Sequence, residues 1–330
     1  MRMSAAWIPL LRPWSYAATL VPFLVVAAFG IDSGADWPRW FGGLVVGLLF
    51  QVTVNLLNTW GDERSGVDDV PGAIRTTPQV HDGLVSMRAV LVVAVTCAVL
   101  ASVVGVLLCI RVSDGGVRLN MPLLVAGVIG FLGATNYSTG IKFKYRGLGV
   151  PFVSFLMGPL EMFAAIALLQ PEFAEVIIDC IVHFPAVMCA LFALWSLPVA
   201  ALVGVIMHGN DMRDIPTDRA AGITTLASRL GPRGALAYYR ICHVVPYAVC
   251  AVLAALAMWK VGLGGALFLI PFLCLPLTVM TLRVAGLAYR ENPQCPRWRR
   301  LERASGVIHL VFGILYAVSM VLWLTYGWAS

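Results

Sequence analysis

The sequence predicts an all-α integral membrane protein with nine membrane-spanning helices. Hydrophobic residues make up 60% of the 330-residue chain and charged residues only 12%, whereas a soluble domain carries roughly 25% charged residues. The mean hydropathy is +0.86, and each long apolar run can cross about 30 Å of hydrocarbon as a helix. A membrane β-barrel would instead show short segments of alternating polarity.

Nine apolar runs, separated by polar segments, are the predicted spans. They are residues 14–31, 38–60, 86–111, 119–138, 148–169, 186–209, 235–259, 263–284 and 303–326. The segment 171–183 is too short and too acidic to span, so we expect an interfacial helix on the outer side. No long polar linker or low-complexity segment divides the chain, and residues 1–330 are therefore interpreted as a single transmembrane domain.

The distribution of Lys and Arg predicts the orientation of these spans. With the N-terminus in the cytoplasm and nine crossings, nineteen of the 23 Lys and Arg residues fall on the cytoplasmic side. The four on the outer side are Arg39, Arg111, Arg118 and Lys260. Cytoplasmic loops of membrane proteins carry an excess of these residues, so the bias supports both the orientation and the odd number of spans. The cytoplasmic (inner) membrane is the expected location.

Charge and cysteine usage exclude several other classes of function. A net charge of +6 would suggest nucleic-acid binding in a soluble protein, but here it reflects basic residues retained on one side of the lipid bilayer. We therefore expect no nucleic-acid partner. The eight cysteines are scattered and form no CxxC pair, so the sequence suggests neither a zinc site nor a disulfide framework. No cleavable signal peptide is expected before the first span.

Two acidic clusters stand at predicted cytoplasmic helix ends. The first acidic cluster, in NTWGDERSGVDD, consists of Asn58, Asp62, Glu63, Asp68 and Asp69. The second, in HGNDMRDIPTDRAAG, consists of Asn210, Asp211, Asp214 and Asp218. A spacing of four places Asn210, Asp214 and Asp218 on one helix face, and Asn58 and Asp62 share that spacing. Like charges four residues apart destabilise a helix, so a neutralising partner is expected.

Magnesium is the natural candidate for that partner. It takes oxygen ligands and is usually held by one or two carboxylates together with substrate phosphates, and two such clusters at one membrane face suggest two ions on a diphosphate. Solvated loop charges are the alternative interpretation, which two clusters each led by Asn make the weaker one. The basic residues available for the outer phosphate oxygens are Arg64, Arg75, Lys142, Lys144, Arg146, Arg213 and Arg219.

These motifs resemble the UbiA superfamily of membrane prenyltransferases, and most closely its MenA-like branch, which prenylates 1,4-dihydroxy-2-naphthoate for menaquinone. The first family motif is matched by Asn58, Asp62, Gly66 and Asp68. The second is matched by Asn210, Arg213, Asp214, Asp218, Gly222, Thr225, Leu226, Ala227, Leu230 and Gly231. YSTGIKFKYRGLG, from Tyr137 to Gly149, resembles the family's loop between the fourth and fifth helices, and RPWSYAATLVP resembles the start of its first helix.

The resemblance implies nine helices around a central cavity, and an active site that opens at the cytoplasmic face. It implies transfer of a prenyl group from a polyprenyl diphosphate to an aromatic acceptor, with Mg²⁺ as cofactor. Lys142, Arg213 and Tyr137 are the expected contacts to the diphosphate or acceptor. The expected ligands are Asn58, Asp62 and Asp68 for one ion, and Asn210, Asp214 and Asp218 for the other. The four Asp residues among these are the expected catalytic residues, and Asp211 is a supporting candidate.

Some features depart from the family pattern or leave alternatives open. Thr59 stands where many members have Asp, and Ile223 stands at the position of a common lysine. Glu161 is the only acidic residue that we place inside a span, and a carboxyl there is a functional-site hypothesis by default. Other acceptors remain alternatives, namely 4-hydroxybenzoate, homogentisate, a tetrapyrrole or a glycerol phosphate lipid. A terpene cyclase and, from another class, a transporter are the remaining readings.

Overall fold

A computed structural model describes residues 3–31, 34–65, 78–113, 116–291 and 298–327 of the chain. The longer helices are α2 (Ala17–Ala27), α3 (Trp37–Ser65), α5 (Met87–Cys109), α6 (Met121–Asn136), α10 (Pro185–Ala220), α11 (Leu226–Val261), α12 (Leu275–Glu291) and α13 (Trp298–Tyr326). The shorter ones are α1 (Met3–Leu11), α4 (Pro78–His81), α7 (Gly149–Phe155), α8 (Glu161–Leu169) and α9 (Pro171–His183). Two strands are present, β1 (Ile110–Ser113) and β2 (Gly116–Leu119).

The predicted all-α membrane class is confirmed. Seven segments of the described residues are long and apolar enough to cross a membrane. The longest of them, 226–290, contains the seventh and eighth predicted spans, because the 3₁₀ segment Gly262–Cys274 connects α11 directly to α12. The fourth predicted span corresponds to α6, a shorter apolar helix. Every predicted span therefore falls on helical structure.

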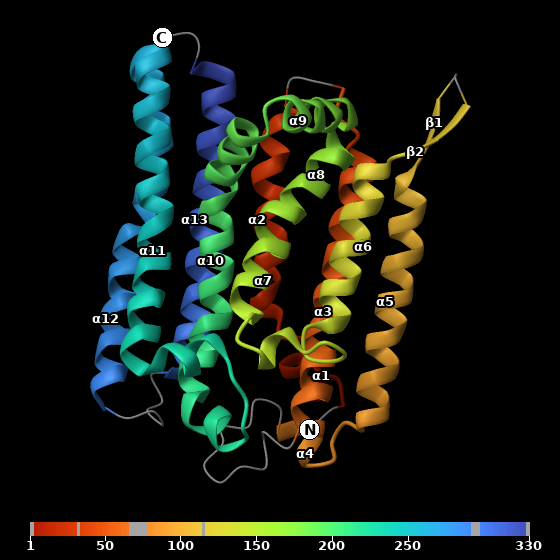
Figure 1. The fold of residues 1–330 in the computed structure, drawn as a ribbon, viewed down its shortest axis with the longest axis vertical. Helices are drawn as coiled ribbons and strands as arrows, with labels where there is room; N and C mark the ends of the chain where they lie inside the picture. The colour runs from red at the N-terminus through yellow and green to blue at the C-terminus, as the bar shows by residue number, and fades with distance from the viewer. Residues whose placement is uncertain (1–2, 32–33, 66–77, 114–115, 292–297, 328–330) are drawn as a thin grey trace.

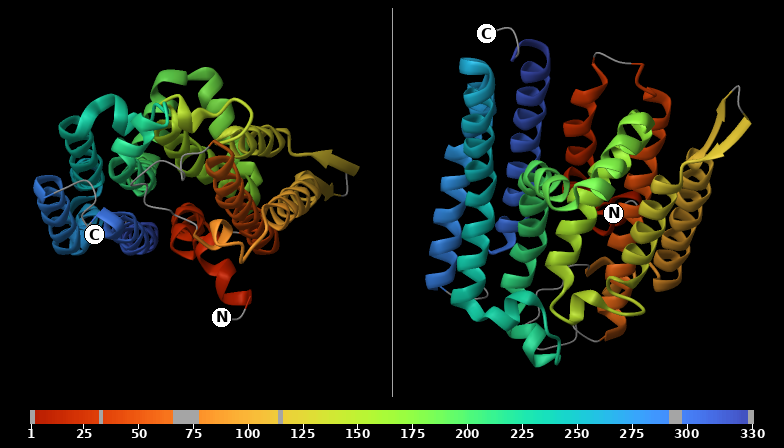
Figure 2. Two further views of the ribbon diagram at one scale, coloured as in Figure 1. Left: turned by 90° about the horizontal axis from the view of Figure 1, so that it is seen from below. Right: turned by 45° about the horizontal axis from the view of Figure 1, so that its top comes forward.

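The long helices lie roughly along one axis and pack side by side (Figures 1 and 2). Helix α10 packs on α11 and α13, and α3 packs on α5. The N-terminus lies at the lower end of the view in Figure 1 and the C-terminus at the upper end, which agrees with an odd number of crossings. The ends of α3 and α10 that carry the acidic clusters both lie at the lower end.

Helix α9 and the β1–β2 hairpin lie at the upper end of the molecule in Figure 1. Helix α9 lies across the tops of its neighbours (Figure 1), as expected for the interfacial segment 171–183. The predicted spans 86–111 and 119–138 are each trimmed, because their adjoining residues form an antiparallel hairpin in which Ile110 pairs with Leu119. Asn120 then caps α6 by accepting a hydrogen bond from the Leu123 N–H at 3.1 Å, which fixes where that helix begins.

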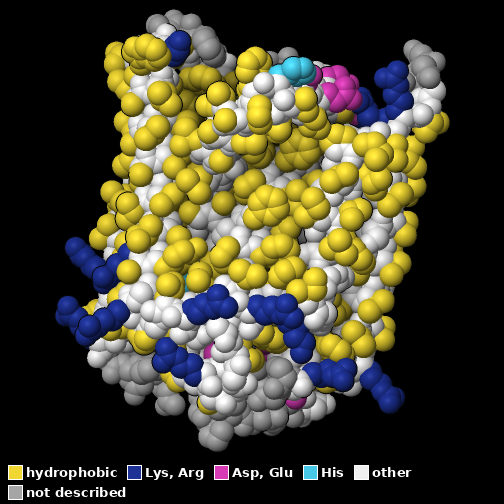
Figure 3. All heavy atoms as spheres, viewed as in Figure 1, with side chains coloured by type: hydrophobic (Ala, Val, Ile, Leu, Met, Phe, Trp, Pro, Cys, Tyr) yellow, Lys and Arg dark blue, Asp and Glu magenta, His cyan; other side chains and the backbone are white. Residues whose placement is uncertain are grey.

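The surface carries the uneven distribution of Lys and Arg that their positions in the sequence predict. On the face in Figure 3 a broad hydrophobic belt covers the middle of the molecule, and most of the Lys and Arg side chains gather toward the lower end. Large apolar side chains on this belt are exposed, for example Val92 at 62% and Leu107 at 61%. Such a continuous apolar surface is expected where lipid replaces water as the solvent.

A π-helical turn shapes the inner wall of the bundle. Residues Leu156–Leu160 form this turn between α7 and α8 and include Pro159. A Cβ added to Gly158 would lie 2.7 Å from the Cβ of Ala200 on α10, so the glycine permits the close approach of the two backbones. π-turns often mark functional positions in helices. Glu161 directly follows the π-turn Leu156–Leu160.

Candidate active site

The acidic clusters lie on the last turns of two long helices. Helix α3 continues to Ser65, beyond the predicted end of the span at residue 60, so Asn58 and Asp62 are both helical. Helix α10 likewise continues to Ala220 and carries Asn210, Asp214 and Asp218 on consecutive turns. Gly222, two residues beyond the end of α10, has a φ of +71°, in the left-handed region that glycine adopts without penalty.

Lys144 neutralises the first acidic cluster. Its Nζ donates hydrogen bonds to Asn58 Oδ1 at 3.0 Å and to both oxygens of Asp62 at 2.7 and 2.9 Å. Tyr145 donates a further hydrogen bond from its hydroxyl to Asp62 Oδ1 at 2.7 Å. Asn58 is 5% exposed and Asp62 is 7% exposed. The ammonium group therefore holds the position that a cation would need between these two side chains.

The second acidic cluster is held by different partners. Arg213 forms a two-pronged pair with Asp214, with both N–H···O distances at 2.6 Å. Asp218 accepts a hydrogen bond from the Thr225 hydroxyl at 3.1 Å, and this hydroxyl also caps α11. Asn210 Oδ1 is buried and has no hydrogen-bond partner among the residues that the structure describes. An unsatisfied buried acceptor of this kind is uncommon in folded proteins and requires an explanation.

The two clusters form one electrostatic unit. Asp62 and Lys144 from the first are among the charges that act on Asp211 and Asp218 in the second. Tyr137, which is 3% exposed, lies within the field of both Asp62 and Asp211. A Cβ on Gly61 would lie 2.9 Å from the carbonyl oxygen of Ser138. The loop after α6 is thus packed directly on the end of α3, and it brings Lys144 between the clusters.

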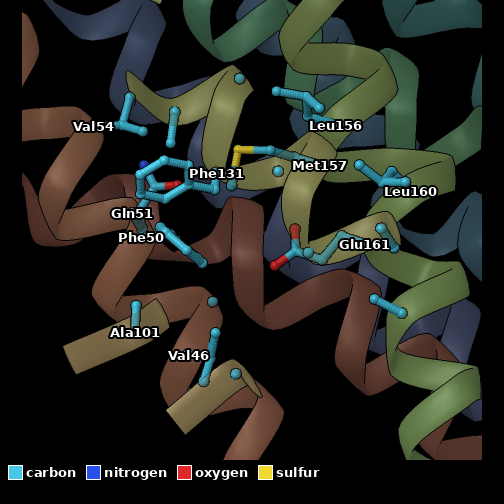
Figure 4. Close-up of a pocket in the computed structure, with 18 of the residues that line it drawn as sticks. Val46, Phe50, Gln51, Val54, Ala101, Phe131, Leu156, Met157, Leu160 and Glu161 are labelled. Atoms are coloured by element: carbon cyan, nitrogen blue, oxygen red, sulfur yellow. The ribbon is translucent and has the colours of Figure 1, made fainter. Parts of the chain in front are cut away.

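A largely apolar cavity of about 340 Å³ begins beside this polar end. Asn58 and Tyr137 line it at the polar end, together with Arg12 and Asn55, and Gln51 follows one turn of α3 from Asn55. Further along, its wall consists mostly of apolar residues of α3, α5, α6 and α8, with Phe50, Phe131 and Met157 shown in Figure 4. A charged site that continues into a hydrocarbon-lined space suits a ligand with an anionic head and an apolar tail.

The structure places most of the predicted site residues together, with three qualifications. Asp68, like Asp69, lies outside the described residues. Lys142 is exposed, its ammonium lies 5.9 Å from the centre of the Tyr145 ring, and it makes no salt bridge to the described residues of either cluster. Arg213 is committed to Asp214.

Two basic side chains that we did not select face the site. Lys144 was one of several nearby cations, and only the 3₁₀ turn Phe143–Tyr145 directs it inward. Arg12 is 7% exposed, has a φ of +49°, lines the cavity, and makes no salt bridge within the described parts of the chain. Its left-handed backbone has no signature in the sequence. A non-glycine residue held in that region often belongs to a functional site.

The donors present fit a hard divalent cation. The two clusters supply amide and carboxylate oxygens, which Mg²⁺ prefers. Among the described residues Asn210 Oδ1 accepts no hydrogen bond, so its lone pairs are available to a metal ion. Among the described residues, no three His, Cys, Asp or Glu side chains already surround one point. Lys144 and Arg213 instead neutralise Asp62 and Asp214.

These features define a polytopic α-helical membrane protein with a charged site at one end of an apolar cavity. The model of the UbiA prenyltransferase family matches residues 19–306. The chain belongs to this family and is a prenyltransferase. The motifs around Asn58 and Asn210 that suggested the resemblance lie within the matched region.

Relatives and solved structures agree with this assignment. The "UbiA prenyltransferase domain-containing protein 1" of Mus musculus and that of Homo sapiens are each 29% identical over 316 residues, which cover 95% of this chain and 84% of theirs. The structure of a UbiA homolog from Archaeoglobus fulgidus bound to GPP and Mg²⁺ matches with a TM-score of 0.58 at 15% identity, over 96% of this chain and 99% of that one. The apo structure of a UbiA homolog from Aeropyrum pernix K1 matches with a TM-score of 0.50 at 14% identity, over 98% and 99%. These two structural likenesses show a common fold.

Proposed function

We propose that this prenyltransferase transfers a polyprenyl group from a polyprenyl diphosphate to 1,4-dihydroxy-2-naphthoate, in a magnesium-dependent reaction of menaquinone biosynthesis. The observation that carries the proposal is the junction of the first acidic cluster with the apolar cavity, at Asn58 and beside Tyr137. The excess of Lys and Arg at that end supports a site on the cytoplasmic face of the cytoplasmic membrane.

Two sets of residues would hold magnesium. The first consists of Asn58 and Asp62, with Asp68 from outside the described residues, and the second of Asn210, Asp214 and Asp218. Bound there, the ions would neutralise charge that develops on the departing diphosphate. Release of the Asp62 carboxylate by Lys144 would leave the ammonium free for a phosphate oxygen, and Arg213 is placed to act in the same way.

The proposed reaction passes through an allylic cation that the cavity wall would protect from water. The carbon–oxygen bond of the prenyl diphosphate breaks, and pyrophosphate leaves with the bonding electrons while an allylic cation remains. An electron-rich ring carbon of the acceptor attacks the cation, and the ring then loses a proton, or a carboxyl group as carbon dioxide. Phe50, Phe131 and Met157 line the cavity and would keep water from the cation.

The nature of the acceptor is supported by two observations. The motifs around Asn58 and Asn210 are most similar to the branch of the family that acts on a naphthoate. Arg12 in addition provides a buried guanidinium at the polar end of the cavity, without a carboxylate partner among the described residues. A buried charge is costly unless it is paired, so an acidic acceptor would supply the missing anion.

An acceptor panel with product mass spectrometry tests the proposal. Purified protein in lipid would receive a labelled prenyl diphosphate, Mg²⁺, and in turn 1,4-dihydroxy-2-naphthoate, 4-hydroxybenzoate and homogentisate. We expect a lipid-soluble adduct with the naphthoate and its loss in Asp214→Ala. Asp179→Asn is the matched control, because Asp179 is an exposed acid on α9 at the opposite end.

The outcomes separate the alternatives. An adduct with another ring alone would reassign the acceptor and leave prenyl transfer standing. Release of pyrophosphate without any acceptor, together with a cyclic hydrocarbon product, would support a terpene cyclase. No release of pyrophosphate under any condition, with Asp214→Ala indistinguishable from the parent protein, would refute the proposed chemistry.

A further inference from the structure

Glu161 introduces a carboxyl group into the apolar part of the cavity. It is the first residue of α8 and follows the π-turn Leu156–Leu160. Figure 4 shows the Glu161 carboxyl directed away from its own helix, toward the side of the pocket that carries Phe50. Among the polar lining residues of α3, Asn58 and Asn55 lie nearest the acidic clusters, and Gln51 lies one turn beyond Asn55 in the direction of Glu161.

Within the described parts of the chain, one oxygen of this carboxyl group has no partner. Glu161 Oε2 is buried and makes no hydrogen bond to any described residue, and the same is true of the neighbouring Thr19 Oγ1. Both side chains converge on Gly47 of α3: a Cβ added there would lie 3.0 Å from Glu161 Oε1 and 2.8 Å from Thr19 Cγ2. No salt bridge to Glu161 occurs in the described ranges. A carboxyl in this setting depends on water in the cavity, and about 340 Å³ gives it room.

The position of Gly47 gives the depth of this carboxyl group. Gly47 and Asn58 lie eleven residues apart on the same helix, α3, which corresponds to roughly 16 Å along its axis at 1.5 Å per residue. Each isoprene unit adds four carbon–carbon bonds, or roughly 5 Å when extended. A prenyl chain with its diphosphate at the acidic clusters would therefore bring its third or fourth unit to Glu161.

We propose that Glu161 limits the length of the prenyl chain that this enzyme accepts, an inference that rests on the proposed prenyl transfer. A short chain ends before Glu161 and leaves water on the carboxyl group. A longer chain displaces that water and surrounds the carboxyl oxygens with hydrocarbon. The unsatisfied polar group then lowers kcat/KM for long chains relative to short ones by roughly five- to a hundredfold.

The test compares allylic diphosphates of two, three, four and seven isoprene units at one fixed acceptor concentration. For the parent protein, we expect kcat/KM to fall once the chain exceeds three or four units. Glu161→Leu replaces the carboxyl with an apolar side chain, so the ratio of kcat/KM for seven units to that for two units should rise at least fivefold. Glu161→Gln keeps a polar group at this depth and should retain the parent's ratio. Leu160→Met is the steric control and should also retain it.

The results distinguish failure of this inference from failure of the proposed function. If no diphosphate is consumed by the parent protein, the proposed prenyl transfer is refuted, and this inference with it. If the parent is active and Glu161→Leu keeps the parent's ratio, or loses activity equally for every chain length, the inference about Glu161 alone is refuted. Glu161→Met, which is unbranched and similar in volume, provides the same comparison if the Leu variant does not fold.

Discussion

At the scale of single residues, Lys144 determines the charge balance of the site. Its ammonium is within 3.0 Å of Asn58 Oδ1 and both oxygens of Asp62, and its side chain is only 14% exposed. Removal of one partner of a buried ion pair leaves an uncompensated charge, which typically costs about 3–5 kcal/mol. If magnesium binds at Asp62 as proposed, it would compete with Lys144 for the same carboxylate.

Lys144→Met should reveal this competition. Without magnesium the variant should unfold at a lower temperature than the parent protein, because Asp62 has lost the hydrogen bonds and charge of the Lys144 ammonium. Added magnesium should raise the unfolding temperature more in the variant than in the parent, and kcat/KM should still fall by on the order of a hundredfold. Thermal unfolding with and without Mg²⁺, combined with a steady-state assay, measures both effects.

The comparison with Lys142→Met makes the prediction specific. Lys142 belongs to the same loop but is exposed and reaches only the ring of Tyr145. Its loss should affect stability and kcat/KM far less than loss of Lys144 does. Equal losses in the two variants would contradict the role given to Lys144 and would favour the choice of Lys142 that the sequence suggested.

At the scale of elements, the close contact between α3 and the loop after α6 aligns the site. Gly61 permits it, because a Cβ would lie 2.9 Å from the backbone oxygen of Ser138. This loop then carries Lys144 and Tyr145 to Asp62. The contact involves backbone, which cannot move aside as a flexible side chain does.

Gly61→Ala should therefore separate α3 from this loop. We expect kcat/KM to fall at least tenfold, since small displacements of catalytic groups have large effects on rate. Gly34→Ala is the control, because a Cβ there has no neighbour within 4 Å, and it should retain the parent's rate. A Gly61→Ala variant with full activity would show that the close contact is not needed for the site.

Comparison of elements also shows which features the sequence could predict. The nine spans and the helix at 171–183 follow from apolar run length and charge. The family motifs predict Asn58, Asp62, Asn210, Asp214 and Asp218 as site residues, and this role stays a prediction. Packing is different, because it depends on contacts between distant segments. Lys144, and not Lys142, reaches Asp62, and Lys144 lies in the 3₁₀ turn that follows Lys142. Arg12 lines the cavity from a backbone position in the left-handed region.

At the scale of the whole molecule, the charge bias predicts the orientation in the membrane. The acidic clusters, the N-terminus and most of the basic side chains lie toward one end (Figures 1 and 3). We predict that this end faces the cytoplasm. Single cysteines at Arg64 and Asp179, which lie on α3 and α9 at opposite ends, allow a direct measurement once the eight native cysteines are replaced.

A membrane-impermeant thiol reagent added to intact cells should label Asp179→Cys, while Arg64→Cys should be labelled only after the cells are opened. The reverse pattern would place the site on the outer face. Labelling of both positions in intact cells would contradict their location on opposite sides of the membrane.

A double-mutant cycle tests most directly whether the two acidic clusters form one site for a prenyl diphosphate. The measurement is kcat for magnesium-dependent pyrophosphate release by Asp62→Asn, Asp214→Asn and the double variant, with Asp179→Asn as control. Residues that act as a unit have strongly non-additive effects. We predict that each single variant loses on the order of a hundredfold and that the double variant loses little more. Independent losses that multiply in the double variant, or full activity in either single variant, would contradict a shared site.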